Sequence, residues 1–157
     1  MQVSLTYKFT QLLDAPPEAA YHWCTDYQPD DLSLMKEKGQ RKIRWITDDT
    51  VILEEIVHQG RKKTKKIKLV KLDPEHLSWY NIQLSGPNKH SAFLYTITPA
   101  AKNRSRLTFR GLMVVYSKVR LTNHKLRLMA ATERQYDANA WKHLAKALHE
   151  QLALSKS

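Results

Sequence analysis

The C-terminal part of the chain is an unbroken stretch of helix-forming residues, and this feature limits the possible folds more than any other. From Thr122 to Leu154 there is no Gly or Pro, and Ala, Leu, Lys, Arg and Glu are abundant. At about 100° per residue, one stripe of this stretch is apolar. The residues on the stripe are Leu126, Ala130, Trp141, Leu144 and Leu148. The stretch therefore predicts one long helix that packs a single face against the rest of the protein.

The sequence before this helix consists mainly of strand-like runs separated by turn residues. Apolar and polar residues alternate from Val3 to Phe9, as in a strand with one buried face. The segment Asp14 to Glu18, with its two prolines, predicts the start of a short helix, and Leu32 to Lys38 predicts a second helical turn before Gly39. Six more strands are predicted at 41–47, 51–58, 62–72, 76–84, 91–98 and 105–116.

No helix separates these six strands, so the pattern favours antiparallel hairpins over a parallel, doubly wound sheet. We therefore expect an α+β fold of the helix-grip type. In this fold a curved, seven-stranded antiparallel sheet surrounds a long C-terminal helix, and two short helices follow the first strand.

Length and composition set the expected class of protein. A chain of 157 residues with 42% hydrophobic and 26% charged residues has the composition of one globular domain, here 1–157. The single cysteine, Cys24, excludes an intramolecular disulfide, and the N-terminal segment lacks the basic and apolar regions of a secretory signal. No apolar run approaches the roughly 18 to 20 residues of a membrane span. We expect a cytoplasmic protein.

The usual signatures of metal, acyl and nucleotide chemistry are missing. The seven histidines form no i, i+4 helical pair and no His-x-His pair, and His149-Glu150 has Ala153 where a zinc helix needs its second histidine. Cys24 lies near His22, but helical neighbours two positions apart point to different sides, so a small buried side chain is the favoured interpretation. The chain has no Gly-x-Ser-x-Gly elbow and no Gly-rich phosphate loop. We predict no metal and no cofactor.

Two segments carry a resemblance to a known superfamily. Leu13-Asp14-Ala15-Pro16-Pro17-Glu18-Ala19-Ala20-Tyr21, followed by Thr25-Asp26-Tyr27, resembles the opening of START-like (SRPBCC) proteins. Tyr95-Thr96-Ile97-Thr98-Pro99 and Ser105-Arg106-Leu107 are similar to the last hairpin of that superfamily, although Lys102-Asn103-Arg104 departs from its usual Gly-Thr-Arg type of turn. The superfamily includes polyketide cyclases and dehydrases, lipid-transfer START domains and the birch pollen allergen.

The resemblance implies a cavity between sheet and helix that binds hydrophobic molecules. It leaves three classes of function open, because functions vary widely within one fold. The first is the binding or carriage of a lipid, isoprenoid or polycyclic aromatic molecule. The second is an enzyme of the cyclase or dehydratase type that uses the same cavity, and the third is an adaptor that binds polyanions through its basic surface.

Aromatic residues are spread through the expected wall of the sheet. They are Tyr7, Phe9, Trp45, Trp79, Tyr80, Phe93, Tyr95 and Phe109. A sheet wrapped on a helix needs such volume for its core, and those that are not packed there would line an apolar pocket. We name Trp79, Tyr80, Phe93, Tyr95 and Phe109 as candidate ligand-binding residues.

Two acids interrupt the apolar stripe of the long helix. Measured from Leu126, Asp137 falls near 20° and Glu133 near 340° at about 100° per residue. A carboxylate that faces a dry core is costly unless it is paired or protonated. Either this part of the helix extends beyond the sheet and both acids are solvated, or they line the polar end of the cavity as ligand anchors or as a general acid and base. Candidate basic partners are Arg41, Arg44, Arg106 and Arg110.

A basic run between Arg61 and Lys71 accounts for much of the net charge of +11. On a strand, Lys62, Lys66 and Lys68 would share one face, and Lys63, Lys65 and Lys71 the other. Such a strand keeps a protein soluble and blocks edge pairing. The alternative is a partner surface for nucleic acid or an anionic membrane, with Lys63, Lys65 and Lys66 as its candidate residues.

Overall fold

A computed structural model describes residues 1–156. Seven strands and three helices follow one another along the chain, with one short 3-10 turn. The elements are β1 (Gln2–Leu13), α1 (Pro17–Thr25), α2 (Asp31–Leu34), β2 (Lys38–Thr47), β3 (Thr50–Gln59), β4 (Lys62–Asp73), η1 (Pro74–His76), β5 (Ser78–Ser85), β6 (Ala92–Pro99), β7 (Ser105–Tyr116) and α3 (Asn123–Ser155).

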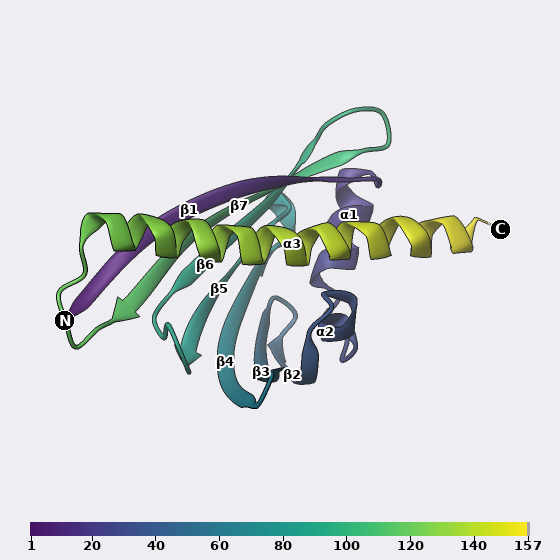
Figure 1. Ribbon diagram of the computed structural model, residues 1–157. Coiled ribbons are helices and arrows are strands. Elements are labelled where there is room, and N and C mark those ends of the chain that lie inside the picture. The colour runs from purple at the N-terminus through teal and green to yellow at the C-terminus, as the bar shows by residue number, and fades with distance from the viewer. Residues whose placement is uncertain (157) are drawn as a thin grey trace.

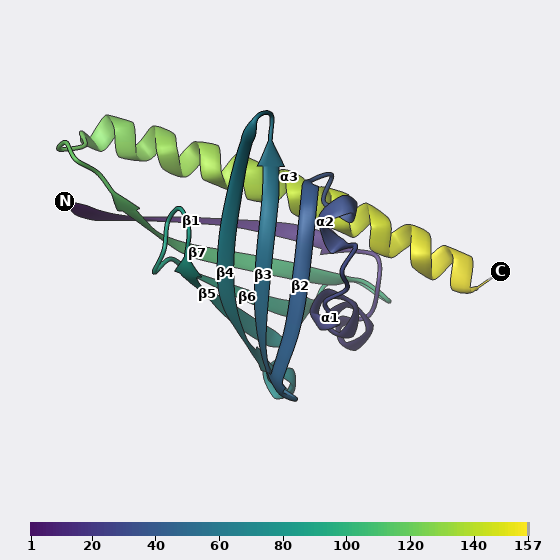
Figure 2. The ribbon, with the colours of Figure 1, turned by 90° about the horizontal axis from the view of Figure 1, so that it is seen from below.

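All seven strands belong to one antiparallel sheet with the order β1-β7-β6-β5-β4-β3-β2. The sheet curls around α3, which lies across its concave side (Figure 1). Seen from below, β2 to β4 run at a steep angle to β1 and β7 (Figure 2). The predicted helix-grip arrangement, with an antiparallel seven-stranded sheet and two short helices after the first strand, is confirmed.

Helix α3 begins and packs as its sequence requires. The Thr122 hydroxyl accepts a hydrogen bond from the backbone N–H of Lys125 at 3.2 Å, which caps the first turn. On the face toward the sheet, Leu144 and Leu148 are buried, and Trp141 packs against them and the strands. Within residues 1–156, no helix is both long enough and apolar enough to cross a membrane.

Helix α1 closes one end of the space between sheet and helix. It begins at the two consecutive prolines, whose fixed φ suits a first turn, and it buries Tyr21 to 2% exposure. The ring of Tyr21 packs edge-on against Trp79 at 5.8 Å, and its hydroxyl donates to the carbonyl of Ser78 at 3.1 Å.

The second short helix is smaller than the sequence predicted. Helix α2 has four residues, and β2 already begins at Lys38, so Gly39 lies inside a strand and does not follow a helix. A Cβ at Gly39 would stand 2.1 Å from the carbonyl oxygen of Ile56. The absence of a side chain therefore lets β2 approach β3 closely at this point.

Candidate functional site

Two adjoining hollows lie between α3 and the concave face of the sheet. One has a volume of about 150 Å³ and lies toward α1 and α2, and the other has about 90 Å³ and lies toward the turn between β5 and β6. Six residues line both hollows: Lys66, Lys68, Asn81, Tyr95, Tyr136 and Asp137. We call the two hollows together the interior cavity. Its wall is more polar than the apolar pocket that the sequence predicted.

Three aromatic side chains pack together in the apolar part of this wall. The rings of Trp79 and Tyr95 stack in parallel with centroids 4.8 Å apart, because the two residues are register partners on β5 and β6. Trp141 of α3 closes over both, at 6.2 Å from Trp79 and 5.5 Å from Tyr95. A flat or aromatic group in the larger hollow would therefore meet ring faces and edges.

A buried ionic cluster stands on the opposite wall. Arg41 of β2 binds Glu55 of β3 at 2.8 Å and Asp31 of α2 at 2.9 Å, and Lys68 of β4 binds Glu55 at 3.1 Å. The side chains of Arg41 and Glu55 are only 6% and 3% exposed. Burial alone would raise the pKa of Glu55, but the charges of Lys68 and Arg41 outweigh burial and lower it to about 2. Glu55 is therefore a permanent anion held between two cations.

Asp137 and Tyr7 form a hydrogen-bonded pair across the cavity. The Tyr7 hydroxyl on β1 donates to Oδ2 of Asp137 on α3 at 2.6 Å. Burial and the nearby Glu133 raise the pKa of Asp137 to about 6, against the opposing effects of the Tyr7 hydrogen bond, Lys68 and Lys66. The Asp137 carboxyl group can therefore take up or release a proton close to neutral pH.

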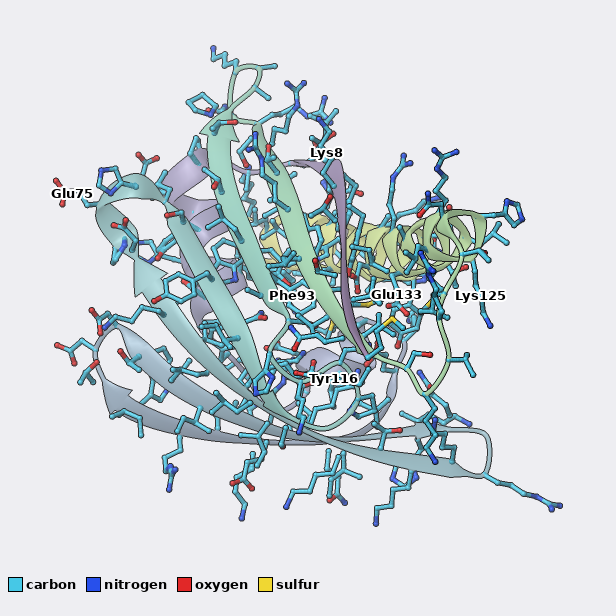
Figure 3. The ribbon with its side chains drawn as sticks, turned by 90° about the vertical axis from the view of Figure 1, so that its left-hand side faces the viewer. Lys8, Glu75, Phe93, Tyr116, Lys125 and Glu133 are labelled. Atoms are coloured by element: carbon cyan, nitrogen blue, oxygen red, sulfur yellow. The ribbon has the colours of Figure 1, made fainter. Side chains whose placement is uncertain are left out.

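Glu133 lies one helical turn before Asp137 on the same side of α3, at the end of the molecule that faces the viewer in Figure 3. Burial raises its pKa, and the charge of Lys66 opposes this effect. Glu133 and Asp137 thus both face the lysines of β4.

Two polar groups in the cavity have no partner. Asn81 is 7% exposed, and its Oδ1 accepts no hydrogen bond. Lys66, which lines both hollows, forms no ion pair within 4.0 Å among residues 1–156. An unpaired buried acceptor is unfavourable, so the cavity offers Oδ1 of Asn81 as an acceptor to an incoming molecule. Lys66 is partly buried and its charge acts on Glu133 and Asp137, but among the described residues its ammonium group is free of a close ion pair and can serve as a donor.

Tyr136 stands where the interior cavity meets the surface. It lines both interior hollows and also two surface hollows, which lie on the same side of α3 and follow one another along the helix. Its hydroxyl donates to Oε1 of Glu37, in the segment between α2 and β2. Tyr136 is 42% exposed and therefore stands at the boundary between the cavity and solvent.

The structure brings five of the seven predicted ligand-binding residues to the cavity. Trp79, Phe93, Tyr95, Glu133 and Asp137 line one or both hollows. Phe109 also points to the concave side but is 1% exposed and stacks on Phe9 at 4.6 Å, so it belongs to the packed core. Tyr80 follows Trp79 on β5 and must point to the other face of the sheet, where it is 42% exposed. Its assignment to the cavity is wrong.

The same alternation corrects the predicted partners of the two acids. Arg44, Arg106 and Arg110 are exposed on the outer face of the sheet. Arg41 points inward, but its partners are Glu55 and Asp31. The cations that face Glu133 and Asp137 come instead from β4.

The three lysines predicted as a polyanion surface do not form one surface. Lys63 and Lys65 are exposed on β4, whereas Lys66 points to the concave side and lines the interior cavity. Alternation already puts Lys66 on the opposite face from Lys63 and Lys65, so the three lysines could not share one face of the strand.

Sequence reasoning missed Glu55, Lys68, Asn81 and Tyr136. One signal was available. In β3, Val51, Leu53 and Val57 stand at every second position and so share one face of the strand, and Glu55 lies on that same face. A lone acid on the buried face of a strand indicates a buried ionic site.

The other potentially reactive groups of the protein do not lie at the polar end of the cavity. Burial raises the pKa of the Cys24 thiol, which keeps it protonated. Among residues 1–156, no three His, Cys, Asp or Glu side chains are placed to hold a metal ion.

No protein-family sequence model and no curated protein sequence matches the chain. Several solved structures resemble it. The Zhui aromatase/cyclase from Streptomyces sp. R1128 superposes with a TM-score of 0.79 over 96% of each chain at 12% identity. Norcoclaurine synthase from Thalictrum flavum, solved in complex with dopamine and hydroxybenzaldehyde, superposes with a TM-score of 0.70 over 95% of this chain and 88% of its own at 12% identity.

A third solved structure, that of Ara h 8.0201, gives a TM-score of 0.63 over 91% of this chain and 99% of its own, at 11% identity. At these identities the similarity concerns the fold, and the strand order, the two short helices and the long α3 agree with it. The chain therefore has the helix-grip fold that these solved structures share.

Proposed function

We propose that this protein binds a compact, largely apolar molecule that carries an oxygen substituent, and that it does so in the interior cavity. One observation carries the proposal: the aromatic wall of Trp79, Tyr95 and Trp141 stands beside two unpartnered polar groups, Asn81 Oδ1 and Lys66. Small-molecule sites combine an apolar wall with a few convergent polar groups in this way.

The volume of the cavity favours a small ligand. Hollows of about 150 and 90 Å³ are below the range of roughly 300 to 1,000 Å³ that is typical of drug-sized ligands. A molecule with one or two rings suits this space better than a lipid, an isoprenoid or a larger polycycle. A larger molecule would first have to move Tyr136 from its hydrogen bond with Glu37.

The comparisons support the same ligand chemistry. Norcoclaurine synthase was solved with dopamine and hydroxybenzaldehyde, which are single-ring molecules with oxygen substituents, and the Zhui protein is an aromatase/cyclase. Such substituents would suit the polar groups of the cavity, because Lys66 can donate to a carbonyl or phenolate oxygen and Asn81 can accept from a hydroxyl.

The binding proposal can be tested with 4-hydroxybenzaldehyde as the probe, by calorimetry and by native mass spectrometry of gently purified protein. We expect Lys66→Met to weaken binding about tenfold, because it removes the charged donor to the ligand oxygen. Lys65→Met is the matched control, since Lys65 is the exposed neighbour on the same strand. Equal affinities of the two variants, or a panel of one- and two-ring phenols and aldehydes that fails to bind, would contradict the proposal.

The pair of Asp137 and Tyr7 favours a second candidate, an enzyme of the cyclase or dehydratase type. A carboxyl group with a pKa of about 6 at 2.6 Å from a phenol hydroxyl can move a proton to or from a bound substrate at neutral pH. In that case the turnover rate should rise with pH around 6 if Asp137 acts as a base. Asp137→Asn should lower kcat by about a hundredfold or more, while substrate binding persists. Binding without any turnover would leave the carrier as the function.

A further inference from the structure

A further hollow lies on the outer face of the sheet, on the side away from α3, and two of its lining residues, Tyr7 and Phe93, also line the smaller interior hollow. It has a volume of about 800 Å³ and is lined by eleven residues of β1, β5, β6 and β7. We call it the outer groove. Its floor is apolar because the strand register places Leu94 opposite Tyr80, and Ala92 opposite both Ile82 and Leu112.

The floor of the outer groove is open to solvent. Tyr80, Leu94 and Leu112 are each 42% to 43% exposed. Single exposed apolar residues are ordinary, but a contiguous exposed patch across three strands is typical of a binding surface.

Two unpaired cations stand at one wall of the groove. Lys8 of β1 and Arg110 of β7 are register partners, so like charges face each other directly. This arrangement is destabilising, and neither residue forms an ion pair or a side-chain hydrogen bond among residues 1–156. An anion between the two side chains would relieve the repulsion. Lys8 is labelled on β1 in Figure 3.

We propose that the outer groove binds a long-chain monoanion such as an alkyl carboxylate, with its chain on Tyr80, Leu94 and Leu112 and its head between Lys8 and Arg110. The proposal is independent of the function assigned to the interior cavity. The volume of about 800 Å³ lies within the range of small-molecule sites.

Three other occupants fit the groove less well. A protein partner needs roughly 20 to 30 residues a side, more than the eleven that line it. A second copy of this chain would bring two net charges of +11 together. A bilayer is met by apolar side chains that protrude, whereas these line a hollow.

The proposal is tested by titrating the full chain with sodium dodecanoate below its micelle concentration and following methyl signals by NMR. We expect saturable shifts at Leu94 and Leu112, none with acetate, and at least tenfold weaker binding of dodecyltrimethylammonium. Arg110→Gln and Leu112→Asn should each raise Kd threefold to tenfold.

The matched controls lie on the same face of the same strands. Arg106→Gln and Leu12→Asn alter an exposed cation and an equally exposed leucine outside the groove, and both should leave Kd within twofold. The proposal is overturned if Arg106→Gln acts like Arg110→Gln or if shifts appear only at cavity residues such as Leu144. Binding only to vesicles of anionic lipid, or dimer formation in place of ligand binding, would also overturn it.

Discussion

The concave face of the sheet has two halves that are stabilised in opposite ways. Over β1, β6 and β7 it is covered by stacked rings, with Phe9 and Phe109 at 4.6 Å and Tyr95 edge-on to Phe109 at 5.2 Å. Over β2, β3 and β4 it carries Arg41, Glu55 and Lys68 in one ionic cluster. We call these the aromatic half and the charged half.

The aromatic half stabilises the fold, because burying such rings removes apolar surface from water at about 25 cal/mol per Å². The charged half costs free energy, since each ion loses its hydration and only the attraction of close partners offsets that loss. Apolar residues could fill the same volume at lower cost. The ionic cluster therefore does not explain the stability of the fold, and it lies in the wall of the cavity for which we propose ligand binding.

The largest expected effect concerns the ionic cluster. Glu55→Gln would leave Arg41 and Lys68 beside a neutral amide in a buried position, so we expect the free energy of unfolding to fall by about 3 to 5 kcal/mol. Urea denaturation would measure the change. The neighbour Glu54, which points outward on the same strand, is the control, and Glu54→Gln should change stability by less than about 0.5 kcal/mol.

A triple replacement separates the cost of burial from the strength of the pairs. When Arg41→Met, Glu55→Leu and Lys68→Met are combined, no charge of the cluster remains to be buried. The triple variant should therefore be clearly more stable than Glu55→Gln alone, and close to or above the wild type. A triple variant less stable than the single one would mean that the charged half stabilises the fold after all.

The two halves also differ in how far the sequence could predict them. The apolar stripe of the long helix identified the positions of Glu133 and Asp137, because helical periodicity fixes directions within one element. Both acids do face the cavity. Their role as ligand anchors remains a prediction.

Strand alternation could not do the same for the sheet. It divides residues into two faces without saying which face is buried, because that choice depends on register. The candidate sets for the cavity and for the polyanion surface each joined residues of both faces, since Tyr80 adjoins Trp79 and Lys66 adjoins Lys65. The structure buries Trp79 and turns Lys66 toward the cavity. The pairing of Tyr7 with Asp137 joins residues 130 positions apart and depends on the closed fold.

The second expected effect is a pH dependence that comes from Asp137. Its pKa is about 6 in the folded protein and 3.8 in the reference state, so the folded state binds the proton more tightly. The contribution of this group to stability is therefore highest at low pH and is lost as the pH rises from about 4 to about 6. Asp137→Asn should be more stable than the wild type by roughly 1 to 3 kcal/mol at pH 8, and equal to it near pH 4.

Thermal or urea unfolding of both proteins between pH 4 and pH 8 would measure this difference. Glu150→Gln is the control, because Glu150 is exposed near the end of the same helix. A constant difference between Asp137→Asn and the wild type at every pH would show that Asp137 is not titrating in this range.

The smallest expected effect concerns the polyanion surface and separates the two faces of β4. Lys63 and Lys65 are exposed, so replacing both with Gln should weaken retention on heparin and lower the slope of log K against log salt by about 2. Stability should change by less than about 0.5 kcal/mol. Binding should be weak at physiological salt and show no sequence preference for nucleic acids.

Lys66 provides the decisive comparison, because it follows Lys65 directly and points into the cavity. Lys66 is partly buried and lines hollows against α3, so we expect it to release fewer counterions from a polyanion than the exposed Lys63 and Lys65. Lys66→Gln alone should therefore change the heparin slope less than Lys63→Gln does, and adding it to the Lys63→Gln, Lys65→Gln pair should have little further effect on retention. If Lys66→Gln lowered retention as much as Lys63→Gln, the side chain would have to reach solvent, and the unpaired cation on which the binding proposal depends would no longer belong to the cavity.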